Sequence, residues 1–325
     1  MTQPVDNLIF DVSGMLYRTF HAGLKVSLRR SSALFEDDDD ADEDTQAVDH
    51  ASFALHSALM SMQKYFNMFS PSRVVACFDR PDNWRKQYMN SDLSVTKLAY
   101  KGNRRQNQTP TEAALFERLI EHMQEFEALL TNETGIITLA RPMLEADDCI
   151  AGWVQRFPNQ RNIIASNDTD MLQLITEHTS VCNLTKSELV QVEDPKFVLF
   201  EKLFRGDKTD NIANAFPGIR TTKLAAAYKD PYLLANLLAE KYVSPNGVEC
   251  TVGEVIEENR LLIDLSKQPP AIRKLMDDTI DAELARDKRL NFWKFSSFCN
   301  QRKLKAVATS LPTLRPLLVG GHRRG

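Results

Sequence analysis

The chain of 325 residues has little of what marks secreted, zinc-binding or membrane proteins. Its five cysteines are an odd number and widely scattered, and its six histidines show no ligand spacing to them. These features argue against a disulfide framework and against a zinc site. No apolar run approaches the roughly 20 residues that span a bilayer, and the N-terminus lacks a charged segment followed by an apolar one. We therefore expect a cytoplasmic protein with no membrane partner.

The net charge of −4 conceals an uneven distribution of acidic residues. Eight of the 44 acids lie in residues 36–44, and nine more lie in the short motifs described below. Without these 17, only 27 acids remain against 40 Lys and Arg. The rest of the surface is therefore basic, as contact with nucleic-acid phosphates requires. Segment 25–46, which carries the acidic run, is expected to be a solvated loop.

Four short apolar runs, alternating with helical patterns, predict an α/β fold with a mostly parallel central sheet covered by helices. The acids that follow these runs are Asp11, Asp79, Glu145 and Asp168. In such sheets ligands bind beyond the carboxyl ends of the strands, so we expect these acids to be neighbours. The later part of the chain is mainly helical, with breaks at proline and glycine. We predict an α/β core over residues 1–200 and a mainly helical part over 201–325.

The remaining acids occur in motifs that begin helices or turns. Glu145-Ala146-Asp147-Asp148 opens a helix, Asp168-Thr169-Asp170 follows a strand, and Gly206-Asp207-Lys208-Thr209-Asp210-Asn211 is rich in turn formers. Each acid alone could be a helix cap. Nine carboxylates at strand ends and helix starts instead favour a magnesium site, because Mg²⁺ prefers carboxylate oxygens and leaves positions for phosphate. Two such ions would support phosphodiester hydrolysis.

These motifs, together with Tyr100-Lys101-Gly102-Asn103-Arg104, resemble the flap endonuclease and 5′-3′ exonuclease family over about residues 5–230. Two further segments, Lys202–Asn211 and Glu258–Asp264, resemble the branch of that family that contains the T-even phage ribonucleases H. The resemblance implies a PIN-like core and a structure-specific 5′-nuclease with RNase H activity. It would remove RNA primers or flaps in phage-type DNA replication, in the host cytoplasm if phage-encoded.

The resemblance also implies two Mg²⁺ ions, which Mn²⁺ could replace. The residues matching the first metal site are Asp11, Asp79, Glu145, Asp147 and Asp168. Those matching the second, more loosely held site are Asp148, Asp170, Asp207 and Asp210.

By the same resemblance, segment 80–110 forms a helical arch over a single-stranded 5′ end. Lys101 and Arg104 would reach the scissile phosphate, and Tyr100 would stack on a base. Residues 205–229 resemble a helix-three-turn-helix that grips duplex DNA and binds K⁺. Further candidates for DNA contacts are Arg105, Lys208, Arg220 and Lys223. The expected Gly-Ile-Gly appears here as Gly218-Ile219-Arg220, which weakens the expectation of a K⁺ site.

Two other classes of protein share part of this pattern. A PIN-like ribonuclease has strand-end carboxylates but lacks the Tyr100–Arg104 motif, and a non-catalytic branched-DNA-binding subunit would have lost carboxylates that are present here. The expected partners of a monomeric nuclease are DNA and RNA:DNA hybrids with 5′ ends or flaps. A single-strand-binding protein and a sliding clamp are further candidates, the latter through Ser310–Leu318.

Overall fold

The structure, a computed structural model, describes residues 4–34, 50–104 and 108–322 and is built around a six-stranded sheet. Its strands are β1 (Asn7–Asp11), β2 (Arg73–Cys77), β3 (Ile137–Leu139), β4 (Asn162–Ala165), β5 (Thr179–Asn183) and β6 (Glu188–Leu189). The order is β3-β2-β1-β4-β5-β6, and every neighbouring pair is parallel except β5 with β6. The predicted mostly parallel sheet is confirmed, and β5 and β6 extend it beyond the four predicted strands.

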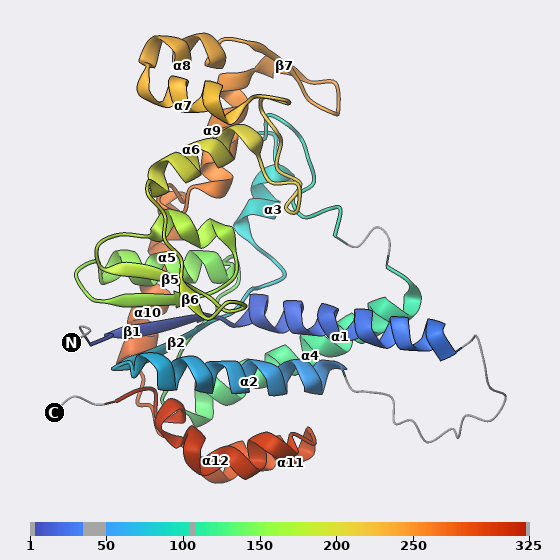
Figure 1. Ribbon diagram of the computed structural model, residues 1–325, viewed down its shortest axis with the longest axis vertical. Coiled ribbons are helices and arrows are strands. Elements are labelled where there is room, and N and C mark those ends of the chain that lie inside the picture. The colour runs from blue at the N-terminus through green and yellow to red at the C-terminus, as the bar shows by residue number, and fades with distance from the viewer. Residues whose placement is uncertain (1–3, 35–49, 105–107, 323–325) are drawn as a thin grey trace.

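Helices cover both faces of this sheet (Figure 1). One face carries α1 (Val12–Leu34), α2 (His50–Phe69), α4 (Pro110–Glu133), α11 (Phe292–Gln301) and α12 (Lys305–Leu318). The other carries α5 (Ala146–Arg156), the 3₁₀ helix η1 (Thr169–Leu174) and α10 (Pro270–Ala285). Leu8 and Phe10 of β1 lie in the first core, whereas Ile9 lies in the second. Burial on both faces explains why the strands are continuous apolar runs.

The loop predicted at 25–46 is partly wrong, because α1 continues to Leu34. The first half of α1 packs against α2 through buried Leu16 and Phe20, and such tertiary packing supplies most of the stability of a helix in a protein. The helix therefore extends beyond the apolar pattern that predicts it. The acidic run at 36–44 lies outside the described residues.

Among its described residues, the predicted arch segment 80–110 is helical only over α3 (Trp84–Met89) and at Pro110, where α4 begins. Turns then run to Arg104, and residues 105–107 lie outside the described part of the chain. Lys97 and Lys101 have positive φ values of 54° and 56°. A residue in this left-handed region cannot continue a right-handed helix, so this stretch stays irregular.

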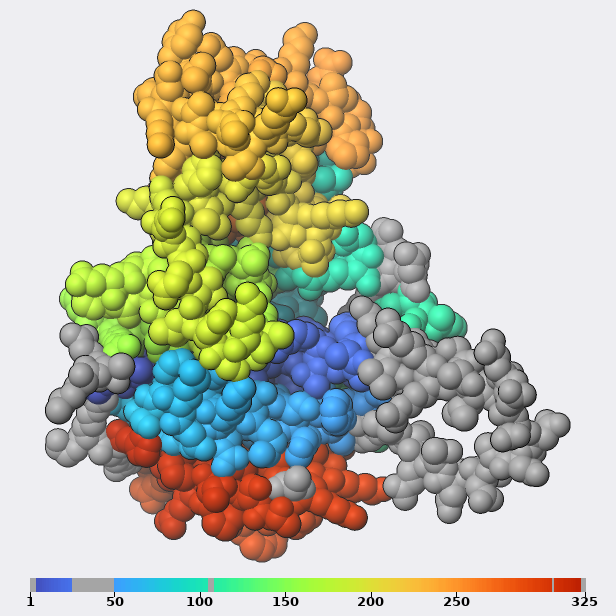
Figure 2. Space-filling model, viewed as in Figure 1, coloured from blue at the N-terminus to red at the C-terminus, as the bar shows by residue number. Residues whose placement is uncertain are grey.

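A third core lies beyond the sheet and forms the lobe at the top of Figure 2. Its elements are α6 (Pro195–Arg205), α7 (Thr221–Lys229), α8 (Pro231–Leu238), α9 (Val252–Ile263) and the hairpin of β7 (Lys241–Val243) and β8 (Glu249–Thr251). Residues 205–229, predicted as a helix-three-turn-helix, run from the last residue of α6 through the turn at 206–212 to the end of α7. Gly206 has φ +64°, and a Cβ there would lie 2.2 Å from the Ala213 carbonyl oxygen, so the turn requires glycine.

The C-terminal helices return to the sheet. Val74 of β2 donates its N–H to the Gly320 carbonyl at 2.9 Å, and Gly135 donates to Leu318 at 2.7 Å. In the segment Ser310–Leu318, the leucines of α12 are buried in the first core and do not face a partner. The core of the sheet is not confined to residues 1–200, because α10, α11 and α12 from the later part of the chain also cover the sheet. Within the described ranges, none of the helices combines the length and apolarity of a bilayer-spanning segment.

Candidate active site

Four carboxylates lie at the carboxyl ends of four adjacent strands. Asp11 is the last residue of β1, Asp79 follows β2, Asp147 lies in the first turn of α5 after β3, and Asp168 follows β4. Because β3, β2, β1 and β4 are parallel neighbours, their ends meet at one edge of the sheet. The structure thus brings together Asp11, Asp79 and Asp168 of the four predicted acids, whereas Asp147 takes the place that the sequence assigned to Glu145.

Hydrogen bonds to main chain and hydroxyl groups hold these side chains in place. Asp11 accepts from the Gly14 N–H at 2.8 Å and from the Ser166 hydroxyl at 3.0 Å, which joins the ends of β1 and β4. Asp79 accepts from the Ala146 N–H at 2.9 Å, which joins the end of β2 to the start of α5. The cluster is therefore preorganised by the turns that follow the strands.

The electrostatics of this cluster call for added positive charge. Burial, together with the nearby charge of Asp79, raises the pKa of Asp11 to about 7. Burial and the charges of Asp168 and Asp11 raise the pKa of Asp147 well above its usual value. Burial likewise raises the pKa values of Asp79 and Asp168. Gathered carboxylates disfavour their own ionisation, and a bound cation relieves this cost.

The donor set fits a hard divalent cation in its chemistry, since the four side chains offer carboxylate oxygens. Among the described residues, no three Asp, Glu, His or Cys side chains are arranged to hold a metal ion as they stand. Side-chain rotation at the cluster would have to bring the oxygens of Asp11, Asp79, Asp147 and Asp168 to a common point. Their gathering and their raised pKa values are the observations that support the fit.

Glu145 is the centre of a buried hydrogen-bond network. Its Oε1 accepts from Lys101, and its Oε2 accepts from Arg85 and from the Tyr100 hydroxyl, both at 3.0 Å. Although burial opposes ionisation, Lys101 and Arg85 lower the pKa of Glu145 to about 2. Both oxygens are thus already engaged by protein donors, unlike those of a side chain that faces an open site.

Asp148 does not belong to the cluster, and its assignment to the second metal site is corrected. Its side chain is fully buried and accepts two bonds from Arg85 at 2.9 Å, one on each oxygen. Trp84 donates its indole N–H to the same carboxylate at 3.2 Å. Sequence reasoning missed Arg85, for which the only signal was the surplus of basic residues in segment 80–110.

The second predicted group contains a lysine that sequence reasoning also missed. Lys202 of α6 contacts both Asp170 and Asp207, the latter at 2.8 Å. Its ammonium group takes the place of a cation between them. Asp207 also accepts the N–H groups of Thr209 and Asp210, at 2.7 and 3.2 Å. Asp170 and Asp207 are therefore neighbours, as the prediction of a second site requires.

The motif Tyr100–Arg104 docks on the turn at 206–212. Asp210 accepts from the Tyr100 hydroxyl at 2.9 Å and from the Arg104 guanidinium, and its carbonyl accepts from the Lys101 N–H at 2.8 Å. Tyr100 is only 7% exposed, so the prediction that it stacks on a base is corrected. Its hydroxyl instead links Glu145 to Asp210. Lys101 and Arg104 lie beside the acidic cluster, where their charges affect the pKa of Asp79.

The other predicted DNA contacts lie on the surface of the third core. Lys208, Arg220 and Lys223 are exposed, whereas Arg105 lies outside the described residues. Arg220 has φ −79°, so this position of the Gly-Ile-Gly pattern does not need glycine here. Gly218, by contrast, has φ +77°. The turn before α7 therefore forms despite the departure from the family pattern.

A cavity of about 220 Å³ lies directly beside the cluster. Asp11 and Asp168 line it, as does Arg18 of α1, which donates to the Thr185 hydroxyl at 3.0 Å. Sequence reasoning missed Arg18; the available signal was its position in the helix that begins directly after Asp11. A basic side chain at the rim of an acidic site is suited to hold a phosphate.

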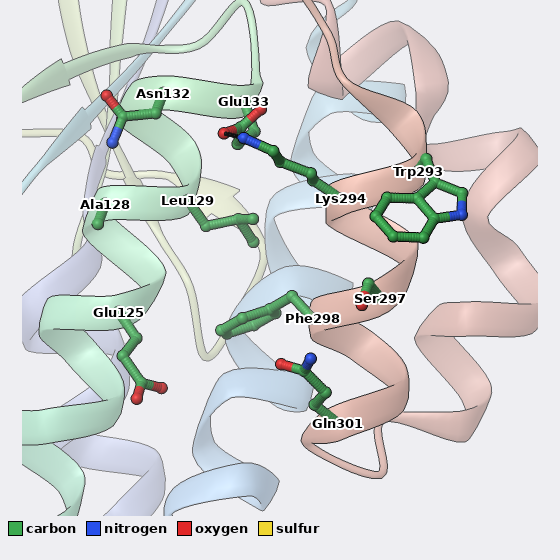
Figure 3. A pocket seen from close by; sticks show the side chains of 10 residues that line it. All are labelled: Glu125, Ala128, Leu129, Asn132, Glu133, Trp293, Lys294, Ser297, Phe298 and Gln301. Atoms are coloured by element: carbon green, nitrogen blue, oxygen red, sulfur yellow. Dashed lines mark hydrogen bonds and ion pairs between the residues drawn. The ribbon is translucent and has the colours of Figure 1, made fainter.

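A larger cavity of about 340 Å³ lies between α4 and α11, away from this cluster. Figure 3 shows Phe298 of α11 pointing toward Leu129 of α4 across it, while Trp293 lies at the α11 side of the cavity. None of the predicted site residues lines this cavity. We therefore assign the active site to the edge of the sheet and not to this groove.

Comparison with known proteins agrees with the fold and the site. Residues 6–202 match the family described as 5′-3′ exonuclease, N-terminal resolvase-like domain. A 5′-3′ exonuclease of Buchnera aphidicola is 28% identical over 182 residues, which cover 53% of this chain and 56% of that protein. A 5′-3′ exonuclease of Bacillus subtilis is 29% identical over 240 residues, or 67% of this chain and 74% of that protein.

Solved structures show the same fold. The T5 D15 protein crystallised with metal ions has a TM-score of 0.60 at 17% identity, covering 86% of this chain and 98% of its own. A complex of T5 D15 flap endonuclease with DNA and metal ions has a TM-score of 0.58, also at 17% identity and covering 86% of this chain and all of its own.

A parallel sheet with carboxylates at its strand ends and a basic motif beside them defines a PIN-like nuclease fold. The match over residues 6–202 goes further, and this chain belongs to the 5′-3′ exonuclease family. The alignment spans little more than half the length of the Buchnera relative, so the activity of the whole protein is treated below as a proposal.

Proposed function

We propose that this protein is a magnesium-dependent, structure-specific 5′-nuclease with exonuclease, flap endonuclease and RNase H activity. It hydrolyses phosphodiester bonds near the 5′ ends of DNA duplexes or RNA:DNA hybrids and so removes RNA primers or flaps during phage-type replication. The observation that carries the proposal is the gathering of four acids at adjacent strand ends beside Lys101 and Arg104. The T5 relative crystallised with DNA and metal ions supports the substrate class.

Asp11, Asp79, Asp147 and Asp168 would hold the first ion. When bound, the metal polarises the phosphate and lowers the pKa of a water molecule that attacks it. The charge that develops on the phosphate oxygens is stabilised by donors placed beside it in advance. Lys101 would supply a positive charge next to these oxygens, and its neighbours Glu145 and Asp210 hold its ammonium group at the cluster.

A second ion would compete with Lys202 for Asp170 and Asp207. Asp210 would join them once Arg104 turns from its carboxylate to the phosphate. Arg104 is suited to this role, because its side chain is partly exposed and a guanidinium binds phosphate with two parallel bonds. The acidic pairs thus hold the basic groups near the site until a more strongly charged ligand arrives.

The duplex would lie along the turn at 206–212 and α7, where Lys208, Arg220 and Lys223 are exposed. Backbone contacts of this kind position a duplex without reading its sequence. A K⁺ ion near Gly218 is part of the proposal, since the turn there forms without the second glycine. Cytoplasmic location, a monomeric state, and contacts with a single-strand-binding protein and a sliding clamp also remain proposals.

The test is cleavage of a labelled 5′-flap DNA by the purified protein with Mg²⁺, with Mn²⁺ and with chelator. We expect cleavage near the junction of single strand and duplex with either ion and none in chelator. Binding of the flap without cleavage in Mg²⁺ would overturn the proposal in favour of a branched-DNA-binding subunit. Asp168→Asn is the control, because it removes a carboxylate without adding bulk.

A second pair of substrates tests the RNase H activity. A nicked duplex whose 5′ segment is RNA and a matched all-DNA duplex differ only in the 2′-hydroxyls of that segment. We expect release of the RNA segment from its 5′ end. Cleavage of the DNA substrate alone would remove primer hydrolysis from the proposal while leaving the flap endonuclease activity.

A further inference from the structure

Helix α9 contacts five separate parts of the molecule through a short run of polar groups. Asn259 donates to the carbonyls of Leu203 and Ala213, at 2.7 and 2.8 Å, and so holds α6 and the end of the 206–212 turn. The Leu262 carbonyl accepts from Arg85 of α3 at 2.8 Å. The Ile263 carbonyl accepts from Gln173 of η1 at 3.1 Å.

Glu258 makes the remaining contact, with the chain that follows α3. One oxygen accepts the Ser94 hydroxyl at 2.8 Å, and the other accepts the N–H groups of Val95 and Thr96 at 3.1 and 2.7 Å. Glu258 is 3% exposed, and among the described residues no Lys or Arg forms an ion pair with it. Burying a carboxylate is costly unless hydrogen bonds replace its water. The three donors supply that replacement.

The turn at Ser94–Thr96 leads directly into the motif that carries Lys101. Ser94 also accepts the Lys97 N–H at 3.1 Å, and Asn246 donates to the Lys97 carbonyl at 2.9 Å. Further along, Asn211 donates to the Ala99 carbonyl at 2.9 Å. The chain from residue 94 to 104 is therefore held at its start by α9 and at its end by the 206–212 turn. It contains no helix or strand of its own.

We propose that Glu258 is a positioning residue for the Tyr100–Arg104 motif. It anchors the start of this chain segment, and the anchor sets where the Lys101 ammonium and the Arg104 guanidinium meet the phosphate. The role rests on the proposed nuclease function, and it acts through Lys101 and Arg104, because Glu258 itself contacts neither the acidic cluster nor the substrate path. An irregular segment needs such an anchor to hold a catalytic group within a fraction of an ångström.

The variants Glu258→Ala and Glu258→Gln test the role, with Glu257→Gln as the matched control. Glu257 is the preceding residue of the same helix and is exposed. Single-turnover cleavage of a 5′-flap is measured at saturating enzyme and Mg²⁺, and flap affinity is measured in Ca²⁺. We expect Glu258→Ala to slow cleavage on the order of 100-fold, the effect of a small misplacement of a catalytic group. Flap affinity should change by less than about threefold, because the duplex contacts at α7 remain.

Glu258→Gln should lie between the wild type and Glu258→Ala. Its amide oxygen can still accept the Val95 and Thr96 N–H groups, while its NH₂ group meets the Ser94 hydroxyl. Hydrogen exchange at Thr96 gives a readout apart from activity, and we expect it to speed up in the order wild type, Gln, Ala. Ser94→Ala removes one donor only and keeps the test open if Glu258→Ala fails to fold.

Wild-type cleavage rates in a folded Glu258→Ala or in both Glu258→Gln and Ser94→Ala would overturn the role. So would a loss of cleavage explained fully by weaker flap binding. An inactive wild-type protein would instead overturn the proposed function, which separates the two failures. Slow flap cleavage by Glu258→Ala, with normal cleavage by Glu257→Gln and unchanged flap affinity, would establish the positioning role of Glu258.

Discussion

Gly14 leaves the space into which the Asp11 carboxylate folds. Its N–H donates to Asp11 at 2.8 Å, and a Cβ at position 14 would lie 2.3 Å from the other carboxylate oxygen. Gly14→Ala should therefore displace Asp11 and lower the flap cleavage rate by about 10- to 100-fold. Thermal stability should change little, because Ala favours a helix over Gly by about 1 kcal/mol, and this gain offsets the cost of moving the Asp11 side chain. Gly23→Ala in the same helix is the control, since its nearest neighbour would be 3.4 Å away. Equal activity of the two variants would contradict the prediction.

Asp147→Asn should separate stability from function at the acidic cluster. The substitution removes one of several carboxylates that repel one another, so the metal-free protein should keep or raise its melting temperature. Mg²⁺ should then raise the melting temperature less than in the wild type, because a ligand that binds only the folded state stabilises it by mass action. Thermal unfolding with chelator and with increasing Mg²⁺ measures both effects. Asp278→Asn, on the exposed side of α10, should respond to Mg²⁺ like the wild type.

The stability of the metal-free protein should fall as pH rises from about 4 to about 7. The pKa of Asp11 is about 7 in the folded protein and 3.8 as its usual value, so the folded state holds the extra proton in this window. The free energy of unfolding then decreases with pH. Glu145 has its pKa lowered from 4.5 to about 2, so its contribution to stability grows between these pH values and is complete above about 4.5.

Denaturant titrations at pH 5 and pH 7.5, with chelator and with Mg²⁺, check this slope. Mg²⁺ should reduce it, because ionised carboxylates bind the cation. Asp11→Asn should also reduce the slope in chelator. A rise in stability between the two pH values in chelator, in the wild type but not in Asp11→Asn, would contradict the assignment.

Asp148 and Asp168 should differ sharply when each is replaced by Asn. Asp148→Asn breaks a buried ion pair and leaves Arg85 short of its partner, which should cost about 3–5 kcal/mol of unfolding free energy. Asp168→Asn should retain stability and flap binding and lose hydrolysis. Chemical denaturation and flap cleavage, measured on both variants, test the contrast. A stable but inactive Asp148→Asn would return Asp148 to the metal site.

The strand ends were predictable because strand and acid are adjacent in the sequence. Asp11 and Asp79 each follow a short buried run, and parallel strands carry such residues to one edge. The direction of Asp147 and Asp148 was not predictable in the same way. Successive residues on a helix point about 100° apart, so one faces the cluster and the other faces α3. To predict which of the two faces the cluster, one must know at which residue α5 begins and which element packs beside it.

The buried basic residues were beyond sequence reasoning for a related reason. Arg85 lies in a polar segment that is typical of a solvated loop, and its partner Asp148 is 63 residues away. Lys202 is likewise separated by 32 residues from Asp170. Long-range ion pairs depend on which elements pack together, and periodicity does not contain that information. Tyr100 shows the same limit, because its burial comes from the 206–212 turn and α9.

The return of residues 292–321 to the sheet has a consequence for biosynthesis. The strands β1 and β2 leave the ribosome early, but the face that carries α1, α2 and α4 is not fully covered until α11 and α12 are made. Gly320 and Gly321 then pack against Gly135 and Ser72 so closely that a Cβ would meet their carbonyl oxygens at 2.1 and 2.2 Å. A nascent chain would therefore expose apolar surface until translation nears residue 321, and chaperones would bind to this surface.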